Sequence, residues 1–259
     1  MSLQPEFVLI VMAAILPPLG LGVILAVRAP FAGRTIPAAV LAFFWGASVA
    51  TTVALWLNDA ATAALPARIG VAQAHRLVPA LVGPTIEELV KAAGVLLVAL
   101  VARPALRDGR VAATMGALVG LGFAAAENTS YYTLAAVQSG YPGLGRAIYL
   151  RGLVQGGNHA AFTAIVGAAV ALAWHHPARS GSRIASIVGG LVTAIALHAL
   201  WNALVSSTIS DVLCNAPSAG STCAAAPDLH DLLVVVPALE MAFLGPILWA
   251  LTRVVRART

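Results

Sequence analysis

Residues 184–207 read IASIVGGLVTAIALHALWNALVSS, a run without Asp, Glu, Lys or Arg. The run exceeds the roughly 20 residues that an α-helix needs to cross the ~30 Å hydrocarbon layer of a bilayer. Comparable apolar runs recur along the chain, and together they predict membrane spans at residues 6–28, 36–57, 79–102, 111–137, 147–174, 184–207 and 229–252. We therefore expect about seven transmembrane helices.

The composition of the whole chain agrees with this prediction. Hydrophobic residues make up 60% of the 259 residues and charged residues 10%, whereas about 25% of the residues are charged in an ordinary soluble domain. Because the bilayer core offers no water to backbone N–H and C=O groups, only helices and closed barrels span it. Spans of this length predict an all-α polytopic bundle, and we expect residues 1–259 to form one integral membrane domain.

Basic residues are distributed unevenly between the expected spans. With the N-terminus outside, the outer connections hold only Arg68, Arg76 and Arg146, and the inner ones hold Arg28, Arg34, Arg103, Arg107, Arg110, Arg179, Arg183, Arg253, Arg256 and Arg258. Because basic loops stay in the cytoplasm, this bias predicts an N-out, C-in orientation. The net charge of +5 then reflects topology, so we expect the lipid bilayer and no nucleic acid as a partner.

Two connections are predicted to face the outside. One holds Cys214 and Cys223, and because disulfides persist outside the cytoplasm we predict a Cys214–Cys223 bridge, with two free thiols as the alternative. The other, residues 58–78, mixes small apolar residues with basic ones and suits a short helix on the membrane surface.

Ionisable and amide side chains inside the expected spans are the main functional signal. Each charged side chain at the bilayer centre costs roughly 2.5–3.5 kcal/mol on insertion scales, so such groups face inward and interact. Four successive spans carry them, as Glu87, Glu88 and Lys91, then Glu127 and Asn128, then Asn158 and His159, then His198 and Asn202.

These side chains share one depth. At ~1.5 Å per residue, a glutamate or histidine of each span lies roughly 13–17 Å below the outer surface, slightly outward of the midplane. Glu87 and Lys91 are four residues apart on one helix face and can pair. Glycines around the polar residues let helix backbones approach closely. We predict one polar site within residues 79–207.

The side chains of this site permit hydrolysis by an activated water. A glutamate can act as general base alone or beside a metal-bound water. Two imidazoles and one carboxylate match the ligands of a catalytic zinc ion with one open position. Nucleophilic catalysis has less support, because no serine lies at this depth in the third to fifth spans. A proton- or ion-coupled transporter is the alternative function, although no internal repeat of the kind found in transporters is evident.

The polar motifs also resemble those of a known family. EELVK at 87–91, FAAAEN at 123–128, His159 and the HxxxN of 198–202 resemble the PrsW family of intramembrane proteases. They resemble more distantly the type II CAAX prenyl endopeptidase superfamily, whose motifs are EExxxR, FxxxH and HxxxN. Glu127 therefore stands where those endopeptidases have a histidine. The resemblance covers about residues 80–205.

This resemblance implies glutamate-dependent hydrolysis of a peptide bond in a membrane-anchored protein. Family members are associated with clipping regulators such as anti-sigma factors on the outer side of the bacterial inner membrane, which agrees with a site slightly outward of the midplane.

A mechanistic hypothesis combines the resemblance with the residues. Glu127, His159 and His198 would bind Zn²⁺, and Glu87 or Glu88 would act as base while Lys91 keeps the other glutamate ionised. Asn128 and Asn202 would orient the scissile carbonyl or stabilise its oxyanion, with Asn158 binding substrate or supporting the site. A metal-free mechanism would use the same residues.

Two further polar residues in the expected spans have no motif around them. Glu240 lies at mid-depth of residues 229–252, and we expect it to have a structural role or to support a neighbouring site residue. Arg151 lies near the outer end of its span, and we expect its guanidinium to extend toward the outer interface.

Overall fold

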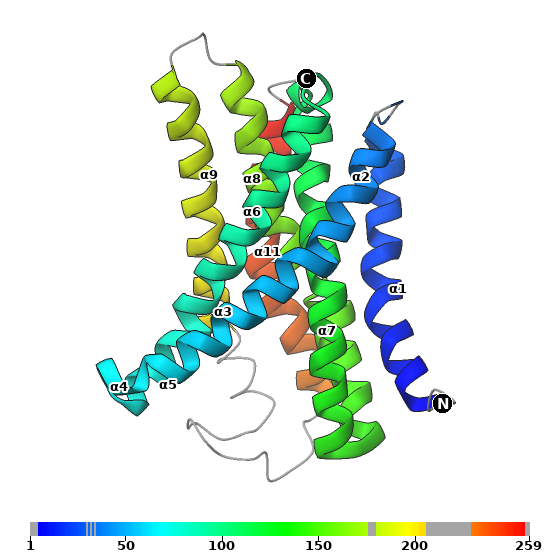
Figure 1. Ribbon diagram of the computed structural model, residues 1–259. Coiled ribbons are helices and arrows are strands. Elements are labelled where there is room, and N and C mark those ends of the chain that lie inside the picture. The colour runs from blue at the N-terminus through cyan, green and yellow to red at the C-terminus, as the bar shows by residue number, and fades with distance from the viewer. Residues whose placement is uncertain are drawn as a thin grey trace.

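The computed structural model describes residues 5–29, 31, 33, 35–175, 180–205 and 229–256. Within these residues every regular element is helical and no strand occurs, which confirms the all-α prediction. Figure 1 shows the long helices side by side in a bundle, with the start of α1 and the end of α11 at opposite ends. Cys214 and Cys223 lie outside the described residues, so their bridge remains a prediction.

The first third of the chain supplies the helix α1 and a longer helical rod built from three segments. α1 spans Pro5–Arg28, and the rod consists of α2 (Thr35–Phe44), the π-helical segment η1 (Trp45–Ala50) and α3 (Thr51–Ala64). The short helices α4 (Pro66–Ile69) and α5 (Val71–Leu77) follow, separated by Gly70 with φ 85°. They lie at the end of the bundle where α1 begins (Figure 1). Residues 58–64 of the predicted surface segment thus belong to α3.

The remaining helices enclose the site. The π-helical segment η2 (Val78–Val82) leads into α6 (Gly83–Val101), and a short 3₁₀ turn, η3 (Ala105–Arg107), precedes α7 (Gly109–Ala147). Then follow η4 (Ile148–Val154), α8 (Asn158–His175), α9 (Ser180–Leu200) and η5 (Trp201–Val205), and finally η6 (Asp231–Val235) and α11 (Val236–Arg256). Asp108 caps α7, because its carboxylate accepts from the backbone N–H of Arg110 at 2.7 Å.

α7 is the central helix of the bundle. Its residues are buried almost continuously from Val111 to Ala125, and it packs against α1, α2, η1 and α8. A side chain at Gly116 or Gly120 would collide with the backbone of α8, at the carbonyl groups of Thr163 and His159. Such close approach through small residues is how helices associate without a hydrophobic driving force between them. It also fixes the start of α8, which carries His159.

Several helices have the length and composition of membrane spans. Among the described residues five stretches qualify, at Glu6–Arg28, Thr35–Ile69, Gly109–Trp174, Gly181–Leu204 and Asp231–Arg256. Gly109–Trp174 contains two of the spans expected from the sequence. α6 carries three charged residues, Glu87, Glu88 and Lys91, and is not among the five. The chain is thus a multi-pass helical protein, and the count of seven spans remains a prediction.

Candidate active site

A cavity of about 420 Å³ lies between α3, η2 and α6 on one side and α7, η4, α8, α9 and η5 on the other. Its size is within the range of ligand pockets in proteins, roughly 300–1,000 Å³. The polar residues that line it include Asn58, Glu87, Glu127, Asn128, Arg151, Asn158, His159, His198 and Asn202. The structure therefore brings together residues that the sequence placed on four successive spans. Glu88 and Lys91 are fully buried and do not line the cavity.

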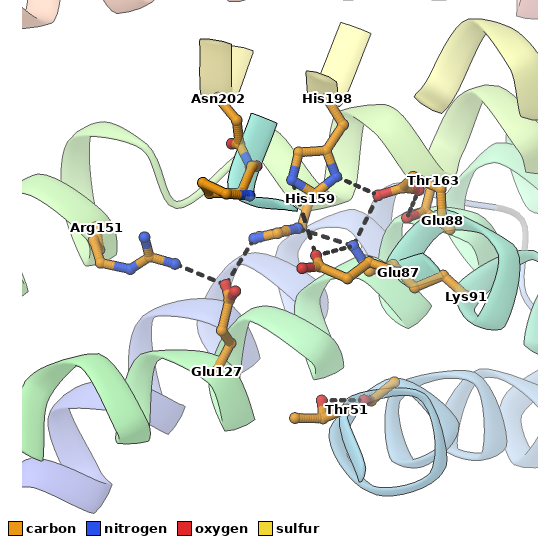
Figure 2. A network of polar contacts seen from close by, with 12 residues as sticks. Thr51, Glu87, Glu88, Lys91, Glu127, Arg151, His159, Thr163, His198 and Asn202 are labelled. Atoms are coloured by element: carbon orange, nitrogen blue, oxygen red, sulfur yellow. Dashed lines mark hydrogen bonds and ion pairs between the residues drawn. The ribbon is translucent and has the colours of Figure 1, made fainter. Parts of the chain in front are cut away.

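Lys91 is the centre of the buried part of the site (Figure 2). Its Nζ donates to Glu88 Oε1 at 2.8 Å and to Glu87 Oε2 at 3.4 Å. The ammonium also lies 3.9 Å from the ring centroid of Phe123, in cation–π geometry. The pairing of Glu87 with Lys91, expected from their i,i+4 spacing, is confirmed, and the i,i+3 contact with Glu88 is the shorter of the two.

Glu88 fixes the orientation of His198. The Glu88 carboxylate accepts from Thr163 Oγ1 at 3.2 Å and lies 3.0 Å from His198 Nδ1. Because an ionised carboxylate only accepts hydrogen bonds, Nδ1 of His198 carries the hydrogen. Nε2 then presents its lone pair toward Glu87, whose Oε2 is 3.9 Å away. A carboxylate behind an imidazole is the arrangement that orients metal-ligating histidines.

His159 connects the buried network to Glu127. Its Nδ1 is 3.1 Å from Lys91 Nζ, and its Nε2 is 3.0 Å from Glu127 Oε2. Since an ammonium group only donates, Nδ1 accepts and Nε2–H donates to the carboxylate of Glu127. The rings of His159 and His198 meet edge-on, with centroids 5.2 Å apart. The two imidazoles expected at one depth are therefore in contact.

Arg151 is a member of the site that the sequence analysis missed. Its Nη2 donates to Glu127 Oε2 at 2.7 Å, and its Nε donates to Asn128 Oδ1 at 3.3 Å. The guanidinium also lies over the ring of Tyr131, 3.6 Å from its centroid. This corrects the expectation that Arg151 extends toward the outer interface, because a nearby carboxylate offers the cation a stronger partner than water at the membrane edge.

Thr163 was also missed, although a signal for it existed. It lies four residues after His159 on α8, so the two side chains share one helix face. The sequence analysis could have included Thr163 on this ground, because its hydroxyl is one helical turn from the site residue His159. Arg151 had no comparable signal, because its contact with Glu127 depends on how η4 packs against α7.

Asn202 ties two helix ends together at the cavity wall. Its Nδ2 donates to the carbonyl oxygen of Pro79 at 2.9 Å. The N–H of Gly83 donates to the carbonyl oxygen of Val78, five residues earlier, as in a π-helix. The next donor in that register would be residue 84, which is a proline without an N–H. The Pro79 carbonyl is therefore left to accept from Asn202.

Asn128 and Asn158 keep polar atoms available at the cavity. Both are buried, at 2% and 4% exposure, and both line the cavity. Within the described residues, Asn128 Nδ2 and both polar side-chain atoms of Asn158 have no hydrogen-bond partner. Buried amides of this kind are costly unless something pairs with them. They are therefore suited to bind a polar ligand.

Glu87, His159 and His198 form a donor group that could hold a divalent metal ion, provided that a ring nitrogen of His159 exchanges its contact with Lys91 or Glu127 for the ion. All three ligand atoms lie within 4.8 Å of one another, and one carboxylate with two imidazoles is a donor set of catalytic zinc. With all carboxylates ionised and both imidazoles neutral, Glu87, Glu88 and Glu127 face only two cations, so the cluster has an excess of one negative charge. Glu127, expected among the ligands, lies beside this group, bonded to His159 and Arg151.

The comparisons with known proteins agree with this site. No curated protein and no solved structure matches the chain. The sequence matches the family described as PrsW family intramembrane metalloprotease over residues 34–227, a range that includes every polar cavity residue named above. The chain therefore belongs to the PrsW family of intramembrane metalloproteases.

Proposed function

We propose that this protein hydrolyses a peptide bond of a membrane-anchored protein at the cavity beside Glu87, His159 and His198, with a zinc ion bound there. The observation that carries the proposal is the group of one carboxylate and two imidazole donor atoms within 4.8 Å, at the wall of a cavity of about 420 Å³. The family match favours proteolysis over the transporter alternative.

Glu127 is the residue best suited to act as general base. Its side chain is 19% exposed and lines the cavity, whereas Glu88 is fully buried behind the wall. When zinc is bound, it supplies an electrophile and a water that is nucleophilic at neutral pH. Glu127 would take a proton from the attacking water and deliver it to the leaving amine. Glu88 has the different role of holding His198, through Nδ1, in the orientation that presents Nε2.

Asn128 and Asn158 are suited to bind the substrate backbone. Asn128 Nδ2 lines the cavity without a partner among the described residues, and its Oδ1 is held by Arg151 Nε. A donor fixed in this way can stabilise the oxyanion of the scissile carbonyl. Asn202 is less suited to this role, because its Nδ2 already donates to Pro79.

The distribution of basic residues supports a reaction near the outer side of a bacterial inner membrane. The apolar runs predict seven spans, and the distribution of arginines predicts that the N-terminus lies outside. Pro79, Arg151 and Asn202, which line or border the cavity, all lie close to the outer ends of their expected spans. A single-span protein with an exposed outer segment, such as an anti-sigma-factor-like regulator, is the matching substrate class.

Metal content and cleavage measured on the same purified samples test this proposal. We expect about one zinc per chain in the wild type, loss of zinc in Glu87→Gln and His198→Ala, and retention of zinc in Glu127→Gln. Cleavage of a single-span reporter should fall by roughly 10²-fold or more in Glu127→Gln, since removal of a general base costs about that much. It should fall at least as far in Glu87→Gln and His198→Ala, because these variants lose the zinc. His75→Ala, which changes a histidine of α5 away from the cavity, is the control and should match the wild type.

The two glutamate variants separate the two possible ligand sets. Loss of zinc from Glu127→Gln and not from Glu87→Gln would return Glu127 to the ligand set and make Glu87 the base. Absence of metal from all samples after zinc is supplied, with cleavage retained, would overturn the zinc assignment in favour of a metal-free mechanism. No cleavage by a zinc-loaded wild type would argue against proteolysis.

A further inference from the structure

Glu240 is a buried acidic residue that the proposed mechanism does not use. It lies on α11, is 2% exposed, and both of its carboxyl oxygens have no hydrogen-bond partner within the described residues. α11 follows the range of the family match, which ends at residue 227. A carboxyl group in this position needs a specific reason, because an apolar side chain would pack there without the cost of burying a polar group.

The polar group facing Glu240 is the carboxamide of Asn158. Asn158 and Glu240 are both buried where α8 packs against α11, and neither side chain completes a hydrogen bond among the described residues. The packing of the two helices explains this placement. Leu244 Cδ2 lies 3.4 Å from the position that a Cβ of Gly157 would take, and Glu240 is on the same face of α11, four residues earlier.

Asn158 stands between Glu240 and the cavity. It begins α8, lines the cavity, and immediately precedes the candidate metal ligand His159. The preceding turn, Gln155–Gly157, supports it only through its backbone, where Asn158 N–H donates to Gln155 O at 3.1 Å. The Asn158 side chain has no hydrogen-bond partner among the described residues, and α11, which packs against α8, carries the carboxyl group of Glu240.

We infer that Glu240 is a positioning residue: from α11 it holds the Asn158 carboxamide at the cavity wall so that Asn158 binds the substrate backbone. When a substrate occupies the cavity, a carboxyl oxygen of Glu240 accepts one hydrogen of Asn158 Nδ2, a bond that is not closed in the present geometry. The second hydrogen of Nδ2, and Oδ1, then remain for a peptide C=O and N–H. This inference rests on the proposed peptide hydrolysis at the same cavity.

Kinetics of reporter cleavage by Glu240→Leu, Glu240→Gln and Asn158→Ala test the inference. Glu240→Leu removes the acceptor while keeping an apolar side chain of similar size, so we expect KM to rise roughly 3- to 10-fold, the effect of losing one hydrogen bond, with kcat changed less than about twofold. Glu240→Gln keeps an acceptor oxygen and should restore KM. The double variant Glu240→Leu/Asn158→Ala should have the KM of Asn158→Ala alone, because the two residues act as one unit.

Matched controls separate positioning from general structural damage. Met241→Leu changes the adjacent residue of α11, whose side chain is 62% exposed, and should leave KM and kcat unchanged. Zinc content and thermal unfolding should be the same in Glu240→Leu as in the wild type. A KM of Glu240→Leu equal to that of the wild type, or additive effects in the double variant, would overturn the inference while leaving the proposed function intact. If the zinc-loaded wild type does not cleave the reporter, the proposed function fails and the inference fails with it.

Discussion

Lys91 determines whether the buried half of the site is stable. Its ammonium is fully buried and contacts Glu87, Glu88, His159 and the ring of Phe123. Buried ion pairs gain little net free energy, because both ions lose their hydration. Removing one partner of such a pair costs much more free energy, because it leaves the opposite charge buried without compensation.

Lys91→Met should therefore lower the free energy of unfolding by about 3–5 kcal/mol, the usual cost of breaking a buried ion pair. Denaturant unfolding in detergent micelles measures the change. Arg151→Met is the comparison, and we expect a smaller loss because the Arg151 side chain is 27% exposed. In Lys91→Met/Glu88→Leu part of the lost stability should return, since one uncompensated charge is gone. A single variant Lys91→Met as stable as the wild type would contradict this account of Lys91.

At the residue scale, the sequence predicted the position of each side chain along its helix better than the direction in which that side chain points. The depth of a side chain follows from counting residues along a helix at ~1.5 Å each, and this count grouped Glu88, Glu127, His159 and His198, which the structure brings together. Direction changes by about 100° with each residue, so Glu87 and Glu88 face different neighbours, and only the packing of α6 decides which. For this reason the sequence analysis left open which glutamate is the base, and it did not anticipate that Glu87 would join the two histidines.

At the scale of elements, contact between α7 and α8 controls the position of His159. Gly120 on α7 faces the carbonyl group of His159 on α8 so closely that a Cβ would collide with it. The sequence analysis expected close approach at such glycines, and the structure confirms it. The π-helical segments η2, η4 and η5 were not predicted, because an extra residue in a helical turn has no signature in hydrophobic periodicity.

Gly120→Ala should destabilise the protein by about 1–3 kcal/mol, because a methyl group inserted into a packed helix contact forces backbone shifts. The shift displaces the start of α8, so zinc affinity should fall as well. Thermal unfolding and zinc titration measure the two effects. Gly189→Ala on α9 is the matched control, since a Cβ there meets nothing within 4 Å, and it should leave zinc binding unchanged. Equal behaviour of the two variants would show that α7–α8 contact does not position His159.

At the scale of the whole molecule, the prediction of seven spans depends on whether α6 crosses the membrane. The apolar runs predicted seven spans, but the charges of Glu87, Glu88 and Lys91 separate α6 from the five stretches that qualify by length and composition. In the structure these three side chains are buried against Phe123, Thr163 and His198. A helix whose charges are paired inside a bundle can cross a bilayer, because lipid does not contact them. We therefore predict that α6 is a span.

Single cysteines on either side of α6 test this directly, in a chain where Cys214 and Cys223 are replaced by alanine. Val71→Cys lies before α6 on α5, where Val71 is 62% exposed, and Arg110→Cys lies after it, where the Arg110 side chain is 54% exposed. With the N-terminus outside and α6 as a span, a membrane-impermeant maleimide should label Val71→Cys in intact cells and Arg110→Cys only after permeabilisation. The reverse pattern would show that the orientation is wrong while α6 still crosses. Labelling of both variants in intact cells, or of neither, would show that residues 71 and 110 share a side of the membrane, so that α6 is not a span and the charged cluster is reached from that side.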